Sequence, residues 1–277
     1  MTVTVAGSSF SGSLDGMTVS GVRNMSAEKE LRAGEYAKWT GTFDVVLEAS
    51  DATGTGAAFA NGYSALAVAV AAKGRAKVTG VMSDGTRVSV PGLRLLLKED
   101  GSEVCVPVLA PLYEGKLGGF GFLLWISADG TVDVTALSQW DATASESAPF
   151  SATLNHVSSS PMAVPGDGTL SFAVDADGVP STIGGQPVLR DLLPSSVAVT
   201  ASSGRLAAEK GNDAKLSIRR FPSTGLFNGS FAIVTQNGDR LRKITVPFTG
   251  ALVDGVGYGS AVIGKTGSVK VSLTATR

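Results

Sequence analysis

Alternation of apolar residues with polar or small ones recurs along this chain and limits its fold more than any other feature. An extended strand gathers every second side chain on one face, so such a pattern is typical of half-buried β-strands. It occurs at residues 63–70, 75–82, 86–90, 103–108, 119–126, 130–137, 169–174, 196–201, 214–219, 229–234, 242–248 and 267–273. We predict a short strand in each segment.

Turn dipeptides separate many of these segments. Asp84-Gly85, Asp129-Gly130 and Asn237-Gly238 each fit the two central positions of a type I′ turn, where both residues take positive φ. Hairpins of this kind join neighbouring antiparallel strands, so we predict antiparallel meanders.

Helix signals are few. Residues 26–34 have Ser26 as an N-cap and Gly34 as a stop, and residues 186–194 run between two prolines. Neither segment repeats in a strand-helix-strand rhythm, which argues against a parallel α/β sheet.

Two parts of the chain share an order of features. Val106-Pro107 precedes GGFGF and DGTVDV, and Val246-Pro247 precedes GVGYG and GSVKV. This suggests an internally duplicated, antiparallel all-β protein with barrel-like or sandwich-like halves. We predict a first unit with an N-terminal extension at residues 1–157, a linker at 158–168 and a second unit at 169–277.

Charge and composition exclude several kinds of partner. The net charge is −1, with 23 basic and 24 acidic residues and no long run of either sign, so nucleic acid is not expected to bind. No apolar stretch is long enough for a transmembrane helix, and the few aromatic residues argue against a membrane barrel. The start, MTVTVAGSSFSGSLDG, lacks signal-peptide features. We therefore expect an intracellular chain or a mature or excised piece of a larger protein.

The glycine-rich segment GVGYGSAVIGKTGSV, residues 255–269, has two interpretations. Its GxxxxGKT pattern matches a phosphate-binding loop, but such a loop must open a helix, and here alternation and further glycines follow. We predict instead a strand with a nearly bare face, where glycines allow sharp coiling or a close backbone approach.

Catalytic groups are sparse. His156 is the only histidine and Cys105 the only cysteine, so a zinc site built on these types is excluded, and both residues are expected to be structural. Facing glycosidase acids can come only from carboxylates such as Asp44, Glu48, Asp133 and Asp141. We predict no enzymatic activity and no catalytic residues.

Two groups of residues are candidates for ligand binding. Asp175 and Asp177 in DADG resemble the start of a calcium loop, although no distal Glu follows. Calcium is the only cofactor considered, and a hairpin turn is favoured. The aromatic candidates for glycan or protein contact are Trp39, Trp140, Tyr36 and Tyr113. Trp39 and Trp140 lie near expected strand ends, so we predict that both are exposed.

Residues 60–140 and 215–275 resemble the Gly-rich β modules of large bacterial surface and autotransporter-like proteins. The segments GYSALAVAVAAKGRAKVTGVMSDGT, VPVLAPLYEGKLGGFGFLLWI, STGLFNGSFAIV and GALVDGVGYGSAVI carry the resemblance. It implies export to the cell surface or outside, and a structural or adhesive role. The expected function is thus a non-catalytic surface module, with a carbohydrate-binding module second and a glycoside hydrolase third. The oligomeric state stays open.

Overall fold

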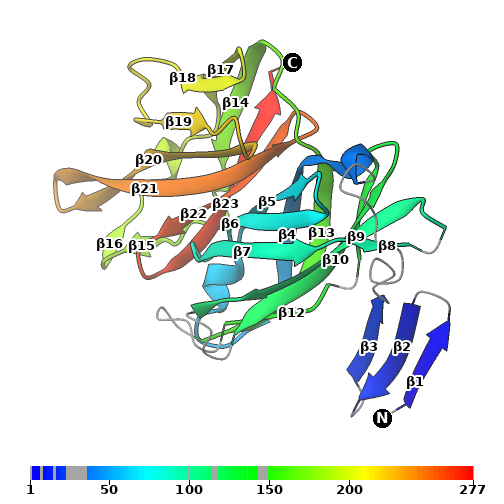
Figure 1. Ribbon diagram of the computed structural model, residues 1–277. Helices are drawn as coiled ribbons and strands as arrows, with labels where there is room; N and C mark the ends of the chain where they lie inside the picture. The colour runs from blue at the N-terminus through cyan, green and yellow to red at the C-terminus, as the bar shows by residue number, and fades with distance from the viewer. Residues whose placement is uncertain are drawn as a thin grey trace.

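The computed structural model describes residues 2–6, 9–14, 17–22, 36–98, 100–113, 118–135, 137–142 and 149–276, the first three ranges as backbone only. Every strand pair that it describes is antiparallel (Figure 1). The predicted antiparallel all-β class is therefore confirmed, whereas internal duplication stays a prediction. Within these residues, no helix has the length and apolar character needed to span a lipid bilayer.

A small sheet lies at the N-terminus, in the region predicted as an extension. Its strands follow one another in sequence order. They are β1 (Thr2–Ala6), β2 (Ser9–Leu14) and β3 (Met17–Val22).

The first lobe, residues 36–161, is a ten-stranded sheet that curls around its own core. The order is β7-β6-β5-β4-β13-β12-β10-β9-β8, with β11 beside β10, and β7 contacts β9 so that the sheet nearly closes. Its strands are β4 (Gly41–Thr53), β5 (Tyr63–Ala71), β6 (Arg75–Val81), β7 (Arg87–Arg94), β8 (Leu96–Leu97), β9 (Glu103–Pro111), β10 (Gly119–Ser127), β11 (Val132–Thr135), β12 (Gln139–Asp141) and β13 (Ser151–Pro161). Two 3₁₀ turns, η2 (Ala37–Trp39) and η3 (Ala57–Ala60), flank β4.

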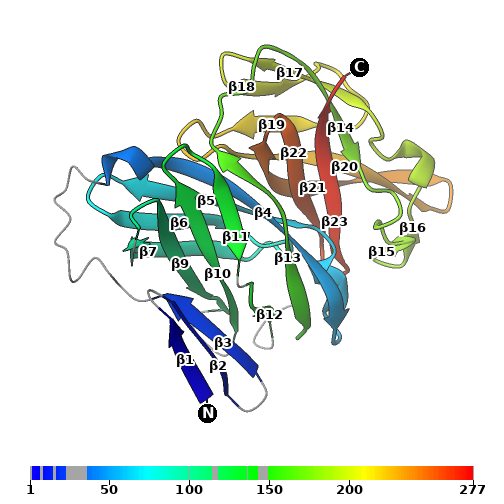
Figure 2. The ribbon, with the colours of Figure 1, turned by 90° about the vertical axis from the view of Figure 1, so that its right-hand side faces the viewer.

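The second lobe, residues 168–275, is an eight-stranded sheet in the order β18-β17-β14-β23-β22-β21-β20-β19 (Figure 2). Its edge strands β18 and β19 contact each other, so this sheet also curls around a core. Its strands are β14 (Gly168–Val174), β17 (Val197–Ser202), β18 (Arg205–Ala208), β19 (Ser217–Arg220), β20 (Leu226–Asn237), β21 (Arg240–Val253), β22 (Val256–Ile263) and β23 (Gly267–Ala275). A ribbon of β15 (Thr182–Ile183) and β16 (Gln186–Pro187) and the 3₁₀ turn η5 (Arg190–Leu192) lie between β14 and β17 in sequence.

Several local expectations need correction. Residues 158–161, placed in the linker, are the end of β13 and pair with β4, so the connection between the two sheets is shorter. Gly85 and Gly130 have positive φ, but Asp84 and Asp129 do not, because each glycine is the fourth residue of its turn. The third turn is centred on Gly238-Asp239.

The two expected helices have different outcomes. Residues 26–34 lie outside the described residues. Residues 186–194 contain only the short turn η5, because Pro187 belongs to β16 and only Arg190–Leu192 are helical.

The glycine-rich segment forms β22, as predicted. A Cβ at Gly257 would lie 2.6 Å from Leu273 Cβ, and one at Gly259 would lie 2.6 Å from Thr249 O. Gly264 then begins the turn to β23, and no helix follows. The bare face thus admits close packing, and the phosphate-loop interpretation is wrong.

Glycines also make room for the aromatic core of the second lobe. Gly250 on β21 pairs with Phe227 on one side and Gly259 on the other. A Cβ at Gly250 would lie 2.4 Å from Phe227 Cζ and 2.4 Å from Tyr258 O. Ring centroids of Phe227 and Phe248 are 6.2 Å apart. The phenylalanine rings therefore occupy the volume that side chains would fill in an ordinary strand.

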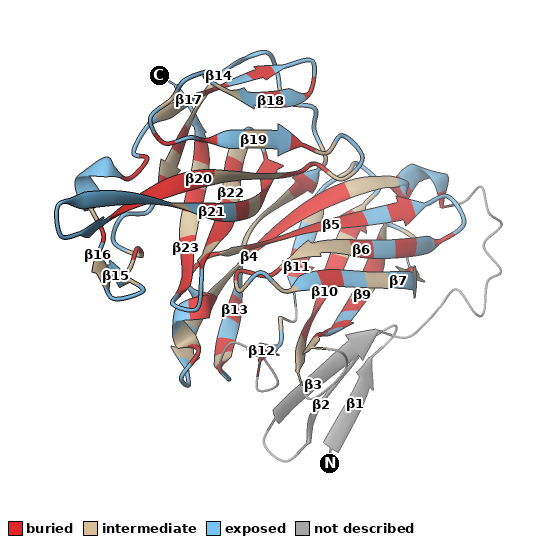
Figure 3. Cartoon of the chain, turned by 90° about the vertical axis from the view of Figure 1, so that its left-hand side faces the viewer, coloured by how far each residue is buried: buried red, intermediate tan, exposed pale blue. Residues whose placement is uncertain are grey.

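The outer face of β4 and β5 is covered by the second lobe (Figure 3). Along β4, Phe43, Val45 and Leu47 face the first core, so alternation turns Asp44, Val46 and Glu48 toward the second lobe. The apolar centre of the contact consists of Val46, Ala65, Ala67, Leu226, Ala251 and Val253.

Hydrogen bonds and an ion pair border this centre. Ser260 Oγ donates to Ser83 O at 2.9 Å, and Ser268 Oγ donates to Phe59 O at 2.6 Å. Lys270 Nζ pairs with Glu48 Oε1 across the lobes. Directional polar contacts of this kind fix the register of one lobe on the other.

Burial of the Asp44 carboxyl group destabilises this contact. The side chain is 0% exposed, and neither carboxylate oxygen has a hydrogen-bond partner among the described residues. Gly225 packs against it, since a Cβ there would lie 2.2 Å from Asp44 Oδ2. Burial raises the pKa of Asp44 to about 7, and the nearby Arg220 guanidinium offsets only part of that effect.

We expect Asp44→Asn to remove a pH dependence of stability. Because the raised pKa makes the folded state bind more protons than the unfolded chain, stability falls as pH rises from about 4 to about 7, by up to roughly 1.4 kcal/mol per pH unit. Urea unfolding at about pH 5 and about pH 8 measures this slope. Asp213→Asn, at an exposed position, is the control. An unchanged slope in Asp44→Asn would contradict the assignment.

We expect Gly250→Ala to destabilise the second lobe by about 1–3 kcal/mol, because the added methyl group overlaps the Phe227 ring and a β22 carbonyl. Gly168→Ala is the matched control, since no atom lies within 4 Å of a Cβ there. Equal unfolding midpoints for the two variants would show that the core absorbs the methyl group.

Candidate functional site

The outer face of β9, β10 and β11 is the strongest candidate for ligand contact, and we call it the outer β9–β11 face. On β10, Phe120, Phe122, Leu124 and Ile126 point into the first core. Alternation therefore turns Leu123, Trp125 and Ser127 outward. Trp125 is partly exposed, whereas both other tryptophans are buried.

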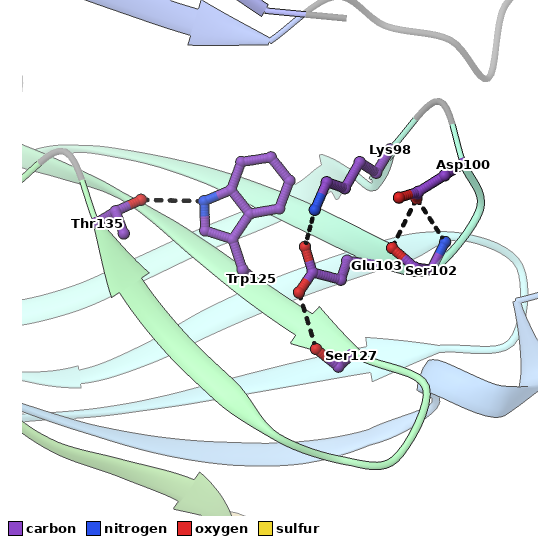
Figure 4. Close-up of polar contacts among 7 residues, drawn as sticks. All are labelled: Lys98, Asp100, Ser102, Glu103, Trp125, Ser127 and Thr135. Atoms are coloured by element: carbon purple, nitrogen blue, oxygen red, sulfur yellow. Dashed lines mark hydrogen bonds and ion pairs between the residues drawn. The ribbon is translucent and has the colours of Figure 1, made fainter.

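Trp125 is held in a defined orientation (Figure 4). Its indole Nε1 donates to Thr135 Oγ1 on β11 at 3.0 Å. Asp133 lies opposite Trp125 on β11, and Cys105 lies opposite it on β9. Burial raises the pKa of the Cys105 thiol to about 12, so the thiol stays protonated and unreactive.

Charged side chains lie at one end of this face. Glu103 accepts hydrogen bonds from Lys98 Nζ at 2.8 Å and from Ser127 Oγ at 3.0 Å (Figure 4). The bond from Lys98 lowers the pKa of Glu103. Asp100 accepts from the backbone N–H and the hydroxyl of Ser102, which lower its pKa as well. Both carboxylates are therefore charged acceptors at neutral pH.

Apolar side chains lie at the other end. Pro107 and Leu123 are partly buried neighbours on paired strands, and Leu109 is 74% exposed. Gly121 allows Leu109 to lie close to β10, since a Cβ there would lie 2.8 Å from Leu109 Cδ2. The face thus runs from charged groups through an oriented indole to an apolar end.

The prediction that Trp39 and Trp140 are exposed is wrong. Trp39 is 3% exposed and Trp140 is 0% exposed, because both pack in the core of the first lobe. Trp39 lies beside Tyr36, which is buried too, with 6.4 Å between the ring centroids. A position near a strand end therefore did not indicate exposure. The rings of Trp39, Trp140 and Tyr36 are covered by the core of the first lobe.

Tyr113 belongs to a polar network with Trp140. Trp140 Nε1 donates to Tyr113 Oη at 3.2 Å, and Tyr113 Oη donates to Asp84 Oδ2 at 2.8 Å. Tyr113 takes a left-handed φ of 53°, which is rare for an aromatic residue and fits a position fixed by its surroundings. Burial raises the pKa values of both Asp84 and Tyr113. The hydroxyl of Tyr113 is thus occupied in joining Trp140 to Asp84.

Asp175 and Asp177 lie in a turn. The backbone N–H of Asp177 donates to Asp175 Oδ1 at 3.2 Å, and the N–H of Asp175 donates to Lys270 O at 3.0 Å. Burial lowers the pKa of Lys270, but its hydrogen bond with Glu48 and, to a lesser extent, nearby charges that include Asp175 raise it overall. In the part of the chain that the structure describes, no three His, Cys, Asp or Glu side chains are grouped as metal ligands. The favoured turn is therefore present, and calcium binding stays the untested alternative.

The remaining candidates for catalysis lie in different places. His156 Nε2 and Ser159 Oγ are 3.0 Å apart on the exposed side of β13. Asp44 and Glu48 are on the β4 face that the second lobe covers, whereas Asp133 is on the outer face of β11.

A crevice of about 300 Å³ lies between the lobes, with Asp84, Ser260, Arg87 and Thr249 among its lining residues. Asp84 already accepts from Thr86 and Tyr113, and Ser260 donates to Ser83 O. These groups serve the structure, so the outer β9–β11 face is the better candidate for binding.

No protein family, curated protein or solved structure matches this chain. A function can therefore be argued only from the geometry of its own residues. The alternation in GFGFLLWIS could have indicated Trp125, because it separates Trp125 from the phenylalanine face.

We expect Tyr113→Phe to lower the free energy of unfolding by about 1–2 kcal/mol, because Asp84 loses a donor and Trp140 Nε1 loses its acceptor. Tyr36→Phe is the control, since the Tyr36 hydroxyl forms no hydrogen bond with the described residues. Thermal unfolding that is equal in the two variants would show that the network adds no stability.

Proposed function

We propose that this chain is a non-catalytic adhesive module of a surface or secreted protein, and that its outer β9–β11 face binds a glycan. The observation that carries this proposal is Trp125, the partly exposed tryptophan, held by Thr135 on an otherwise ordered strand surface. An amphipathic ring fixed in this way offers a flat surface for a sugar without a large loss of side-chain entropy on binding.

The polar neighbours of Trp125 suit a sugar as well. Asp133 and Thr135 are exposed on β11, and Glu103 and Ser127 lie one row along on β9 and β10. Carboxylates accept hydrogen bonds from sugar hydroxyl groups, and the hydroxyls of Ser and Thr both accept and donate them. A sugar stacked on Trp125 would therefore have hydrogen-bonding groups on both sides.

The placement of the carboxylates supports a non-catalytic role. A glycosidase needs two acids that face each other across a bound sugar. Asp44 is buried between the lobes, and Glu48 is paired with Lys270. On the outer β9–β11 face, the hydrogen bond from Lys98 lowers the pKa of Glu103, which opposes a role as general acid. We therefore rank glycoside hydrolysis below binding.

A protein partner is the second candidate, and the exposure of Leu109 favours it. Leu109, Leu123 and Pro107 form an apolar end that a sugar does not require. Apolar and aromatic side chains at the centre of a contact are typical of protein interfaces.

We expect saturable binding on a glycan array, weakened at least about tenfold by Trp125→Ala and much less by Trp125→Phe, because the phenyl ring retains part of the stacking surface. Leu192→Ala, on the second lobe, is the exposed control. Thermal unfolding of each variant separates lost binding from lost folding. If no glycan on the array binds, and a host protein binds in a way that Leu109→Ala weakens, the protein partner is favoured. Glycan binding that survives Trp125→Ala would remove this face from consideration.

A further inference from the structure

A hairpin of β20 and β21 projects from the second lobe, and we call residues 234–247 the β20–β21 arm (Figure 1, Figure 3). Residues 236–243 at its tip are all exposed. The long pairing of β20 with β21 continues to Asn237↔Arg240, well beyond the residues of β21 that pair with β22.

Pro247 marks the start of the arm. Strand β22 pairs with β21 from Val253 only as far as Phe248. The next residue along, Pro247, has no N–H to donate, so the ladder with β22 cannot continue in the same register. Strand β21 therefore extends toward Arg240 with β20 as its only neighbour among the described residues.

One edge of the arm is covered and the other is open. On β20, Thr235 forms a bridge with Val188, and the N–H of Leu189 donates to Val234 O at 2.9 Å. The closing pair of the hairpin, Asn237↔Arg240, is a hydrogen-bonded pair, because only two residues connect the strands. From Arg240 onward, the N–H and C=O groups of β21 point alternately toward β20 and away from it. The residues with outward main-chain groups are Leu241, Lys243 and Thr245, and no strand of the described residues pairs with that edge.

The open edge is basic. The side chains of Arg240, Arg242 and Lys243 form no hydrogen bond or ion pair with the described residues, and Asp239 is the single acid at the tip. Arg240 and Arg242 share one face of the strand, two positions apart. Between them, Leu241 is 63% exposed and points to the opposite face.

We infer that the open edge of β21 binds an extended acidic segment of another polypeptide by strand addition. The main-chain groups of Leu241, Lys243 and Thr245 supply the ladder. An acidic residue opposite each arginine and an apolar residue opposite Leu241 give the preferred pattern, acidic–apolar–acidic. This surface is separate from the outer β9–β11 face and does not depend on the function proposed for it.

A second copy of this chain fits the edge poorly. Two antiparallel β21 edges would place basic side chains opposite one another, and like charges at such positions are destabilising. Basic side chains commonly protect open edges against self-association. The same charges leave the edge available to an acidic segment.

Fluorescence anisotropy with a labelled, end-capped peptide TVELEVT tests this inference on the full chain, and TVKLKVT is the matched basic peptide. We expect the acidic peptide to bind saturably and the basic peptide not to bind. Arg240→Glu with Arg242→Glu should weaken it at least about tenfold. Thr245→Pro should weaken it too, because it removes an outward N–H at a position that tolerates proline as Pro247 does.

Lys73→Glu with Lys77→Glu, at exposed positions of the first lobe, is the control of equal charge and should bind normally. Thermal unfolding verifies that each variant is folded. Absence of binding up to about 1 mM peptide would overturn the inference. Equal loss in the control pair, or binding unaffected by Thr245→Pro, would also overturn it, because either result indicates charge attraction without strand addition.

Discussion

The contact of the second lobe with the outer face of β4 and β5 is the interaction on which the rest of the arrangement depends. It buries an apolar centre built on Val46, Ala65 and Ala67, and it fixes the lobes with hydroxyl-to-carbonyl bonds and the Lys270–Glu48 pair. The same contact removes Asp44 from water, and within the described part of the chain no group forms a hydrogen bond with its carboxylate. A buried carboxylate with a pKa near neutrality is destabilising when ionised, so the apolar and polar contacts around it must offset that cost.

The contact also decides which surfaces remain free. The outer faces of β4 and β5 pack against the second lobe, whereas the outer face of β9, β10 and β11, where Trp125 is held by Thr135, lies away from that contact. The second lobe offers the β20–β21 arm, where Pro247 ends the ladder with β22. The first surface has an indole and hydrogen-bond acceptors, and the second has main-chain groups and basic side chains that no other described residue pairs with.

Close packing inside each lobe relies on small residues at chosen positions. Gly250 and Gly259 pair on neighbouring strands of the second lobe, where Gly250 lies against the Phe227 ring and Gly259 against Thr249 O, and Gly121 lies against Leu109 on the first lobe. In each case a neighbouring side chain or carbonyl occupies the space of the missing Cβ. At these positions glycine is needed because it has no side chain to clash with its neighbours. At Gly85 and Gly130 it is needed because the backbone has a positive φ.

The sequence by itself indicated many of the strands, the antiparallel class and the strand character of residues 256–263, because alternation and turn residues act over short distances. The predicted segments did not include β4 or β13. It did not reveal that Trp39 and Trp140 are buried or that Trp125 is the oriented aromatic, since alternation defines two faces of a strand without saying what covers either. Only the tertiary structure decided that Asp44 lies between lobes and that Glu48 meets Lys270. Those contacts join residues far apart in the chain, and their formation depends on how two curled sheets fit together, which no local pattern encodes.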